Sequence, residues 1–167
     1  MLLPRAAEDV ARSAPIEASA PPVPSLHGVR VLVADDEPLI RRLLSELLTQ
    51  AGAHVTTARD GNAAHRLLRE TPTVCDVLVT DQTMPGLTGS ALIEKARELR
   101  PDLAAVLLSG FGESSDIARL QQIGVRFLPK PIDENLLLDA IAELAAADHA
   151  GRITPPALRA VPSAEHG

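Results

Sequence analysis

The chain alternates five times between a short apolar run of strand length and a longer segment whose apolar residues recur at helical spacing. The apolar runs occupy residues 29–34, 54–58, 77–81, 103–108 and 125–128. Runs of this length, closed by turn residues, predict strands, and the periodic segments between them predict helices. Strands that alternate with helices join into parallel sheets through right-handed crossovers. The pattern therefore predicts an α/β fold: a doubly wound, five-stranded parallel sheet with five helices covering both faces.

The two ends of the chain differ in composition from this repeating region. Residues 1–28 are rich in Ala, Pro and Ser. Such a segment buries too little apolar surface to offset its ordering entropy, so we expect a disordered linker. The last predicted helix, capped by Asp133, runs to about residue 147, and the prolines beyond it predict a disordered tail over residues 148–167. The ordered domain is thus expected to span residues 29–147.

Charge and cysteine content exclude several classes of protein. The formal net charge of −6 at pH 7 gives no basic surface for nucleic acid or an anionic membrane, so neither partner is expected. No apolar run is long enough to cross a membrane, and no signal-peptide pattern is present. The single cysteine, Cys75, cannot form an internal disulfide and adjoins an apolar run, so we expect it to be buried. These features favour a cytoplasmic location.

Polar side chains stand where four of the five predicted strands end. In chain order they are Asp35 and Asp36, Asp81, Ser109 and Lys130. In a doubly wound sheet the carboxyl ends of the strands open on one crevice, where ligands bind. Carboxylates gathered there repel each other unless a hard cation such as Mg²⁺ neutralises them. Together with a lysine and a hydroxyl, they predict a site for a transferred phosphoryl group.

Each of these residues also has a plainer interpretation. Asp35 and Asp36 would suit a helix N-terminus. Ser109 would suit a turn, and Lys130 a solvated surface. Asp81 is harder to explain in this way, because a carboxylate at the end of so apolar a run is costly unless something there requires it. Four complementary groups at four strand ends favour the functional interpretation.

Four strings at these strand ends resemble the receiver domain of two-component response regulators. They are VLVADDEP at 31–38, TDQTMPGLTG at 80–89, LSG at 108–110 and FLPKP at 127–131. The likeness covers about residues 29–147 and neither end of the chain. It implies the flavodoxin-like receiver fold with strand order 2-1-3-4-5, a signalling domain rather than an enzyme, and a cis peptide bond before Pro131.

The resemblance also implies the chemistry of the site. Asp81 would accept a phosphoryl group from the phosphohistidine of a histidine kinase or a histidine phosphotransfer protein. Asp36, Asp81 and the backbone carbonyl of Thr83 would bind Mg²⁺, with Asp35 acting mostly through water. The resemblance therefore predicts a phosphorelay component with Mg²⁺ as its cofactor.

A conformational switch is implied as well. Lys130 would contact the phosphoryl group, and Ser109 would move toward it so that Phe127 turns inward. The change would be sensed on the face made by the fourth helix, the fifth strand and the fifth helix. The other aromatic residue of the chain, Phe111, also flanks the crevice. Two positions depart from the family pattern: Thr88 stands where an Asp is usual, and Phe127 replaces the commoner tyrosine.

How the domain is connected to others is a separate question. About twenty Pro- and Ala-rich residues follow it, too few for an output domain, which favours a stand-alone receiver. The family also allows a receiver homodimer. The string LLPRA at residues 2–6 instead resembles the end of a histidine-kinase ATP-binding domain. In that case the chain would be the terminal receiver of a hybrid histidine kinase.

An aspartyl-phosphate hydrolase of the haloacid dehalogenase type is an alternative of another class. Such an enzyme needs a second Asp two residues after the phosphorylated one. This chain has Glu37 at that distance from Asp35, and Thr83 at that distance from Asp81. A flavodoxin-like cofactor carrier would need a first loop that cradles phosphate, and the acidic loop here would repel phosphate without a metal. Both alternatives fit less well than a receiver.

Overall fold

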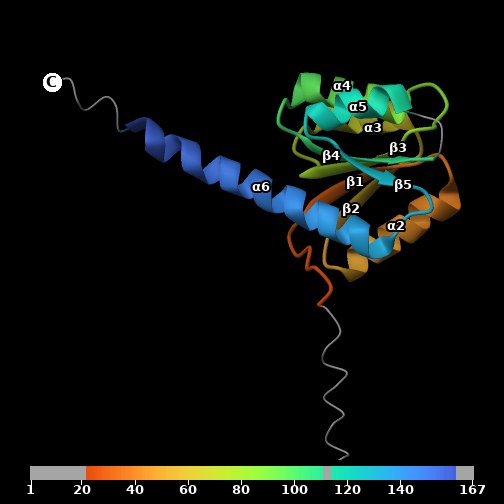
Figure 1. The fold of residues 1–167 in the computed structure, drawn as a ribbon, viewed down its shortest axis with the longest axis horizontal. Coiled ribbons are helices and arrows are strands. Elements are labelled where there is room, and N and C mark those ends of the chain that lie inside the picture. Colours follow the sequence, from red (N-terminus) through yellow and green to blue (C-terminus); the bar gives the residue numbers. More distant parts are fainter. Residues whose placement is uncertain (1–21, 111–113, 161–167) are drawn as a thin grey trace, which may run out of the picture.

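The computed structural model describes residues 22–110 and 114–160, which form one sheet and the helices that cover it. The strands are β1 (Arg30–Ala34), β2 (His54–Ala58), β3 (Val77–Asp81), β4 (Ala104–Ser109) and β5 (Arg126–Pro129). The helices are α2 (Pro38–Gln50), α3 (Gly61–Glu70), α4 (Gly89–Leu99), α5 (Ser114–Gln122) and α6 (Glu134–Ala160). All strand pairs are parallel, in the order β2-β1-β3-β4-β5 (Figure 1). The predicted fold class and strand order are confirmed.

Short polar side chains fix where two of the helices begin. Asp60 caps α3, because its Oδ1 accepts the N–H of Ala63 at 2.7 Å. Asp133, the predicted cap of the last helix, accepts the N–H groups of Asn135 and Leu136 at 2.9 and 3.1 Å. These bonds satisfy first-turn donors that have no partner within the helix.

Alternate residues of each strand face opposite sides of the sheet, and each side has its own apolar core. The core that contains Val79 lies under α2 and α6, and the core that contains Leu78 lies under α3, α4 and α5 (Figure 1). β3 is the central strand and is buried along its whole length. Its position explains why its sequence is continuously apolar until the strand reaches the edge of the sheet.

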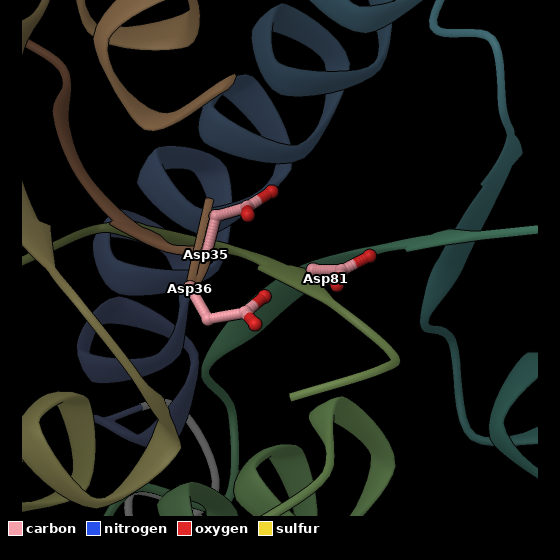
Figure 2. Close-up of side chains that lie close together, drawn as sticks. All are labelled: Asp35, Asp36 and Asp81. Carbon is pink, nitrogen blue, oxygen red and sulfur yellow. The ribbon is translucent and has the colours of Figure 1, made fainter. Parts of the chain in front are cut away.

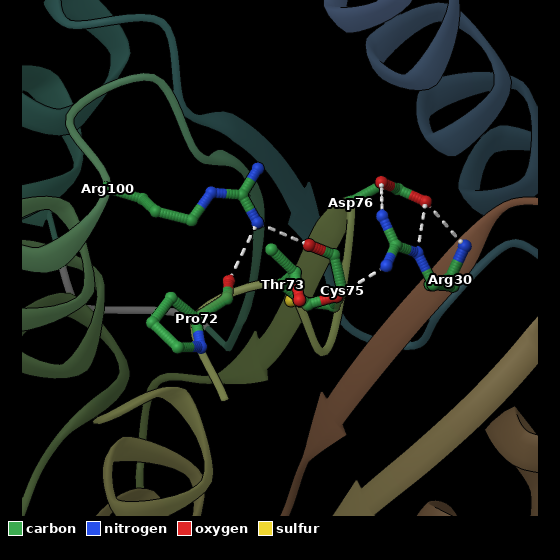
Figure 3. Close-up of polar contacts among 6 residues, drawn as sticks. All are labelled: Arg30, Pro72, Thr73, Cys75, Asp76 and Arg100. Atoms are coloured by element: carbon green, nitrogen blue, oxygen red, sulfur yellow. Dashed lines mark hydrogen bonds and ion pairs between the residues drawn. The ribbon is translucent and has the colours of Figure 1, made fainter. Parts of the chain in front are cut away.

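At the amino ends of the strands, two arginines hold the loop between α3 and β3 (Figure 3). The side chain of Arg30 donates to the Asp76 carboxylate through Nε at 3.2 Å and Nη2 at 2.8 Å, and its backbone N–H adds a third bond at 2.8 Å. Arg100 donates to the carbonyl oxygens of Pro72 and Cys75 at 3.1 and 2.5 Å. The Cys75 side chain is buried as predicted, and burial raises the pKa of its thiol to about 11.

Among the described residues, the first side chain buried in the core is that of Leu26, a little before the predicted boundary at residue 29. The Leu26 side chain is fully buried in the core under α2 and α6, and its N–H donates to the carbonyl of Ala51 at 2.8 Å. A single leucine among prolines and serines makes no periodic pattern, so composition assigned it to the linker. Residues 1–21 of the predicted linker lie outside the described residues.

We expect Leu26→Ala to lower the free energy of unfolding by about 2–3 kcal/mol, because the lost side chain leaves a cavity in the core. The matched control is Val23→Ala, since Val23 is 63% exposed. That change should cost less than about 0.5 kcal/mol. Urea unfolding followed by circular dichroism measures both variants. A Leu26 variant as stable as the Val23 variant would exclude Leu26 from the folded unit.

At the other end, α6 continues past residue 147 and ends at Ala160, where a disordered tail had been expected. The prediction gave most weight to Pro155 and Pro156, which lack the N–H donor of a helix interior. Alanines at 145–147 and 150 are strong helix formers and extend the helix instead. This part of α6 leads away from the sheet (Figure 1). Residues 161–167 lie outside the described residues. None of the helices in the described part of the chain has the length and apolarity needed to cross a membrane.

Candidate functional site

Three carboxylates meet at the carboxyl ends of β1 and β3 (Figure 2). Asp35 and Asp36 follow β1, Asp81 ends β3, and the two strands are hydrogen-bonded neighbours. One oxygen of each carboxylate lies within 4.8 Å of the others. Asp35 is fully buried and Asp81 is 4% exposed, whereas Asp36 is exposed. The structure therefore brings together the three carboxylates that the strand-end pattern singles out.

Burial and mutual repulsion raise the proton affinity of two of these carboxyl groups. The pKa of Asp35 is raised, first by burial and then by the charges of Asp81 and Asp36, against the bond its Oδ1 accepts from the Glu37 N–H at 2.8 Å. The pKa of Asp81 is also raised, again first by burial, although Lys130 opposes the shift. Three carboxylates in this arrangement favour a bound cation.

A comparison of two buried carboxylates separates a structural role from a functional one. Asp76, 3% exposed, has its charge matched by Arg30 at the opposite edge of the sheet. Among the described residues Asp35 forms no ion pair, although the charge of Lys130 acts on it, and its Oδ2 is buried with no hydrogen-bond partner in the same part of the chain. A buried, unpaired carboxylate oxygen costs free energy. Mg²⁺ fits this donor set, because it prefers carboxylate and water oxygens and would offset the three negative charges.

Lys130 reaches the acidic cluster from β5, across the end of β4. Its Nζ lies 2.6 Å from Oδ1 of Asp81. The backbone N–H of Lys130 donates to the carbonyl of Ser109 at 2.9 Å, and the bond to Pro131 is cis, as predicted. Burial lowers the pKa of Lys130, but the hydrogen bond and the charge of Asp81 outweigh it. The pKa is raised on balance, so the side chain is a cation beside Asp81.

The other predicted site residues lie around this cluster. Ser109 is 1% exposed at the end of β4, and its hydroxyl donates to the carbonyl of Gly110 at 3.3 Å. Phe127 is half-buried on β5, and Thr83 is exposed in the loop after β3. The metal-binding role of Thr83 and the switch roles of Ser109 and Phe127 stay predictions. Phe111 lies outside the described residues.

Contacts at the start of α4 were not predicted from the sequence. Gln82, directly after Asp81, bonds Gly89 through its backbone and Ser90 through its side chain. No motif or periodicity marks a glutamine that bonds a serine eight residues further on. Thr88, noted only as a departure from the family pattern, is the N-cap of α4, since its Oγ1 accepts a backbone N–H three residues on.

Comparisons with known proteins agree with this geometry. A family model described as response regulator receiver domain matches residues 31–142. The two-component response regulator ARR11 of Arabidopsis thaliana is 37% identical over 106 residues, which are 63% of this chain and 20% of that protein. The response regulator receiver protein CpdR of Brucella abortus (strain 2308) is 39% identical over 82 residues, 49% of this chain and 67% of that protein. The chain thus spans about a fifth of the length of the plant regulator.

Solved structures are similar as well. The crystal structure of a response regulator receiver domain protein from Clostridium thermocellum aligns with a TM-score of 0.70 at 28% identity, covering 73% of this chain and 98% of that one. A response regulator receiver protein from Sinorhizobium medicae WSM419 aligns with a TM-score of 0.64 at 30% identity, covering 74% and 99%. These matches favour a receiver over the hydrolase and the cofactor carrier.

Proposed function

Because the chain belongs to the response regulator receiver domain family of two-component signalling, we propose that Asp81 accepts a phosphoryl group from a phosphohistidine. The observation that supports this most is the surroundings of Asp81. Its carboxylate is buried at a strand end, lies within 4.8 Å of two other carboxylates and is 2.6 Å from the Lys130 Nζ. An acceptor, an acidic cation site and a fixed cation suit phosphoryl transfer.

In the proposed step, an oxygen of the Asp81 carboxylate attacks phosphorus. The new bond joins that oxygen to phosphorus, and the bond from phosphorus to the histidine nitrogen breaks. The electron pair of the broken bond stays on the imidazole, which then takes a proton. The Lys130 ammonium group, already beside Asp81, contacts the oxygens of the transferred group and offsets their charge.

Asp35, Asp36 and Asp81 would hold Mg²⁺, with the backbone carbonyl of Thr83 as a further ligand and Asp35 acting mostly through water. The bound ion supplies positive charge that offsets the carboxylates and the phosphoryl oxygens. Support comes from the three clustered carboxylates and from the buried Oδ2 of Asp35, which no described residue hydrogen-bonds. Without a metal ion, the phosphoryl group would approach three carboxylates whose negative charge Lys130 offsets only in part.

The donor would be a histidine kinase or a histidine phosphotransfer protein. α2 begins two residues after Asp36 and exposes Leu39 and Leu43, which are 79% and 50% exposed. Residues four apart are neighbours on one helix face, so the two side chains form an apolar contact surface beside the acidic cluster. A protein that presents a phosphohistidine to Asp81 would have this surface within reach.

Intact-mass measurement tests the proposal directly. The chain is incubated with acetyl phosphate, a small phosphodonor, in the presence and absence of Mg²⁺. We expect the mass of one phosphoryl group to be added when Mg²⁺ is present, and little when EDTA removes it. No addition under either condition would contradict the proposal.

The switch is tested by Ser109→Ala. In the proposed mechanism the Ser109 hydroxyl moves to the phosphoryl group and Phe127 turns inward beside it. α5 has one fully buried apolar side chain, Leu120, so it should shift most easily. We expect the variant to accept phosphate while amide NMR shifts stay near Asp81. In the wild type they should spread over residues 117–127.

Ser109→Thr is the matched control, because it keeps the hydroxyl and should preserve the spread of shifts. A phosphoryl group can move the equilibrium only through contacts that differ between the two states. If the shifts spread equally far in the Ser109→Ala variant, Ser109 has no part in the switch.

A further inference from the structure

The loop between β3 and α4 is closed by Gln82, whose four hydrogen bonds join three elements. Its backbone N–H donates to the carbonyl of Leu108 on β4 at 2.9 Å, and its carbonyl accepts the N–H of Gly89 at 3.0 Å. Its side-chain Oε1 accepts the N–H of Ser90 at 2.8 Å, and its Nε2 donates to the Ser90 Oγ at 3.1 Å. The residue next to the phosphoryl acceptor therefore ties β3 to both β4 and α4.

These bonds use the donors at the start of α4. The first N–H groups of a helix have no partner within the helix and are free to bind anions or side chains. In α4 the N–H groups of Gly89 and Ser90 are taken by Gln82, and that of Ala91 by the Thr88 Oγ1. The start of this helix therefore serves to close the loop rather than to face the phosphoryl site.

Close packing adds to the constraint. A Cβ at Gly89 would collide with the carbonyl oxygen of Asp81, so only glycine fits where the ends of the loop meet. Ser90 is 5% exposed, and so is Met84, which packs into the core under α4. Thr83 lies between the anchored Met84 and the bonded Gln82.

We propose that Gln82 is a positioning residue. Its side-chain amide fixes the loop, so that Asp81 and the Thr83 carbonyl are held in the positions needed to bind Mg²⁺ and to accept phosphate. The inference rests on the function proposed above. Groups that orient metal ligands contribute to affinity without touching the metal, because a mobile ligand loses conformational entropy when the metal binds. Gln82 acts in this way through its two side-chain hydrogen bonds to Ser90, which join the two ends of the loop.

The test compares Gln82→Met, which keeps the size of the side chain and removes both amide contacts, with the wild type. Mg²⁺ itself is the probe, titrated while amide NMR shifts are followed. We expect the dissociation constant for Mg²⁺ to rise about tenfold, as for other groups that orient metal ligands. The initial rate of phosphorylation by acetyl phosphate at limiting Mg²⁺ should fall in parallel, and the Ser90 amide should exchange its hydrogen faster.

Gln122→Met is the matched control, because Gln122 is exposed on α5 and the same chemical change is made there. It should leave the Mg²⁺ dissociation constant unchanged. Ser90→Ala is the second test variant: it keeps the Ser90 N–H bond to Oε1 and loses both the bond from Nε2 and the 3.3 Å contact between the Ser90 Oγ and the Thr88 Oγ1. Because it removes only neutral hydrogen bonds and leaves one amide contact in place, we expect about a threefold rise in the dissociation constant.

The outcomes distinguish this inference from the proposed function. A wild-type chain that neither binds Mg²⁺ nor accepts phosphate contradicts both. If the wild type does both and Gln82→Met binds Mg²⁺ as the wild type does, the positioning role is overturned, even if the variant melts at a lower temperature. If Gln82→Met does not fold, Ser90→Ala decides the matter. An unchanged dissociation constant in that variant overturns the inference as well.

Discussion

Asp81→Asn is expected to remove phosphoryl acceptance altogether. An asparagine keeps the size and position of the side chain, but its amide oxygen is a poor nucleophile and carries no charge. The Lys130 Nζ, now 2.6 Å from Oδ1 of Asp81, would lose its ion pair. After incubation with acetyl phosphate and Mg²⁺, the variant should keep its unmodified mass while the wild type gains one phosphoryl group.

Asp116→Asn provides the matched control, since Asp116 is exposed on α5 and is not one of the three clustered carboxylates. It should be phosphorylated as the wild type is. A labelled histidine kinase that phosphorylates the wild type should also transfer its phosphoryl group to the Asp116→Asn control. With Asp81→Asn, the phosphoryl group should stay on the kinase. Full labelling of the Asp81 variant would place the acceptor elsewhere in the chain.

Asp36→Ala should weaken Mg²⁺ binding by more than about a hundredfold, because even groups that only orient metal ligands cost 10- to 100-fold. Asp36 is exposed, so its loss should change the free energy of unfolding by less than about 0.5 kcal/mol. A large loss of affinity without a loss of stability would identify a ligand. Calorimetric titration with Mg²⁺ and the rate of phosphorylation should change together.

Two further variants place this result in context. Asp35→Ala should weaken Mg²⁺ binding less, since Asp35 acts mostly through water in the proposed site. Asp139→Ala, at an exposed position of α6, should have no effect. Unchanged Mg²⁺ affinity in the Asp36 variant would mean that the family's metal-binding role does not apply to this chain.

The features that sequence predicted well are those with a strong local pattern. The run at 77–81 is apolar because β3 is buried on both faces, and Asp81 interrupts it where the strand reaches the crevice. The convergence of Asp35 and Asp36 with Asp81 follows from the parallel arrangement of neighbouring strands. The strand order came from the family likeness, since periodicity does not say which strands are neighbours.

Features that depend on long-range contacts were missed. Leu26 is isolated in sequence and becomes part of the core only through its contacts in the folded chain. The bonds between Gln82 and Ser90 depend on a loop conformation that the residue types alone do not predict. Asp35 and Asp76 are both buried aspartates beside apolar strands, so the sequence alone does not separate them. In the structure, Asp76 is paired with Arg30, whereas the Oδ2 of Asp35 has no hydrogen-bond partner among the described residues.

The most direct test of the central claim is to identify which residue carries the phosphoryl group. The wild-type chain is phosphorylated with acetyl phosphate and Mg²⁺, then treated with borohydride, which reduces an aspartyl phosphate to homoserine. Peptide sequencing by mass spectrometry locates the change. We predict homoserine at position 81 and unmodified Asp35 and Asp36. Homoserine at another position, or a phosphoryl group that survives on a histidine, would contradict the assignment of Asp81 as the acceptor.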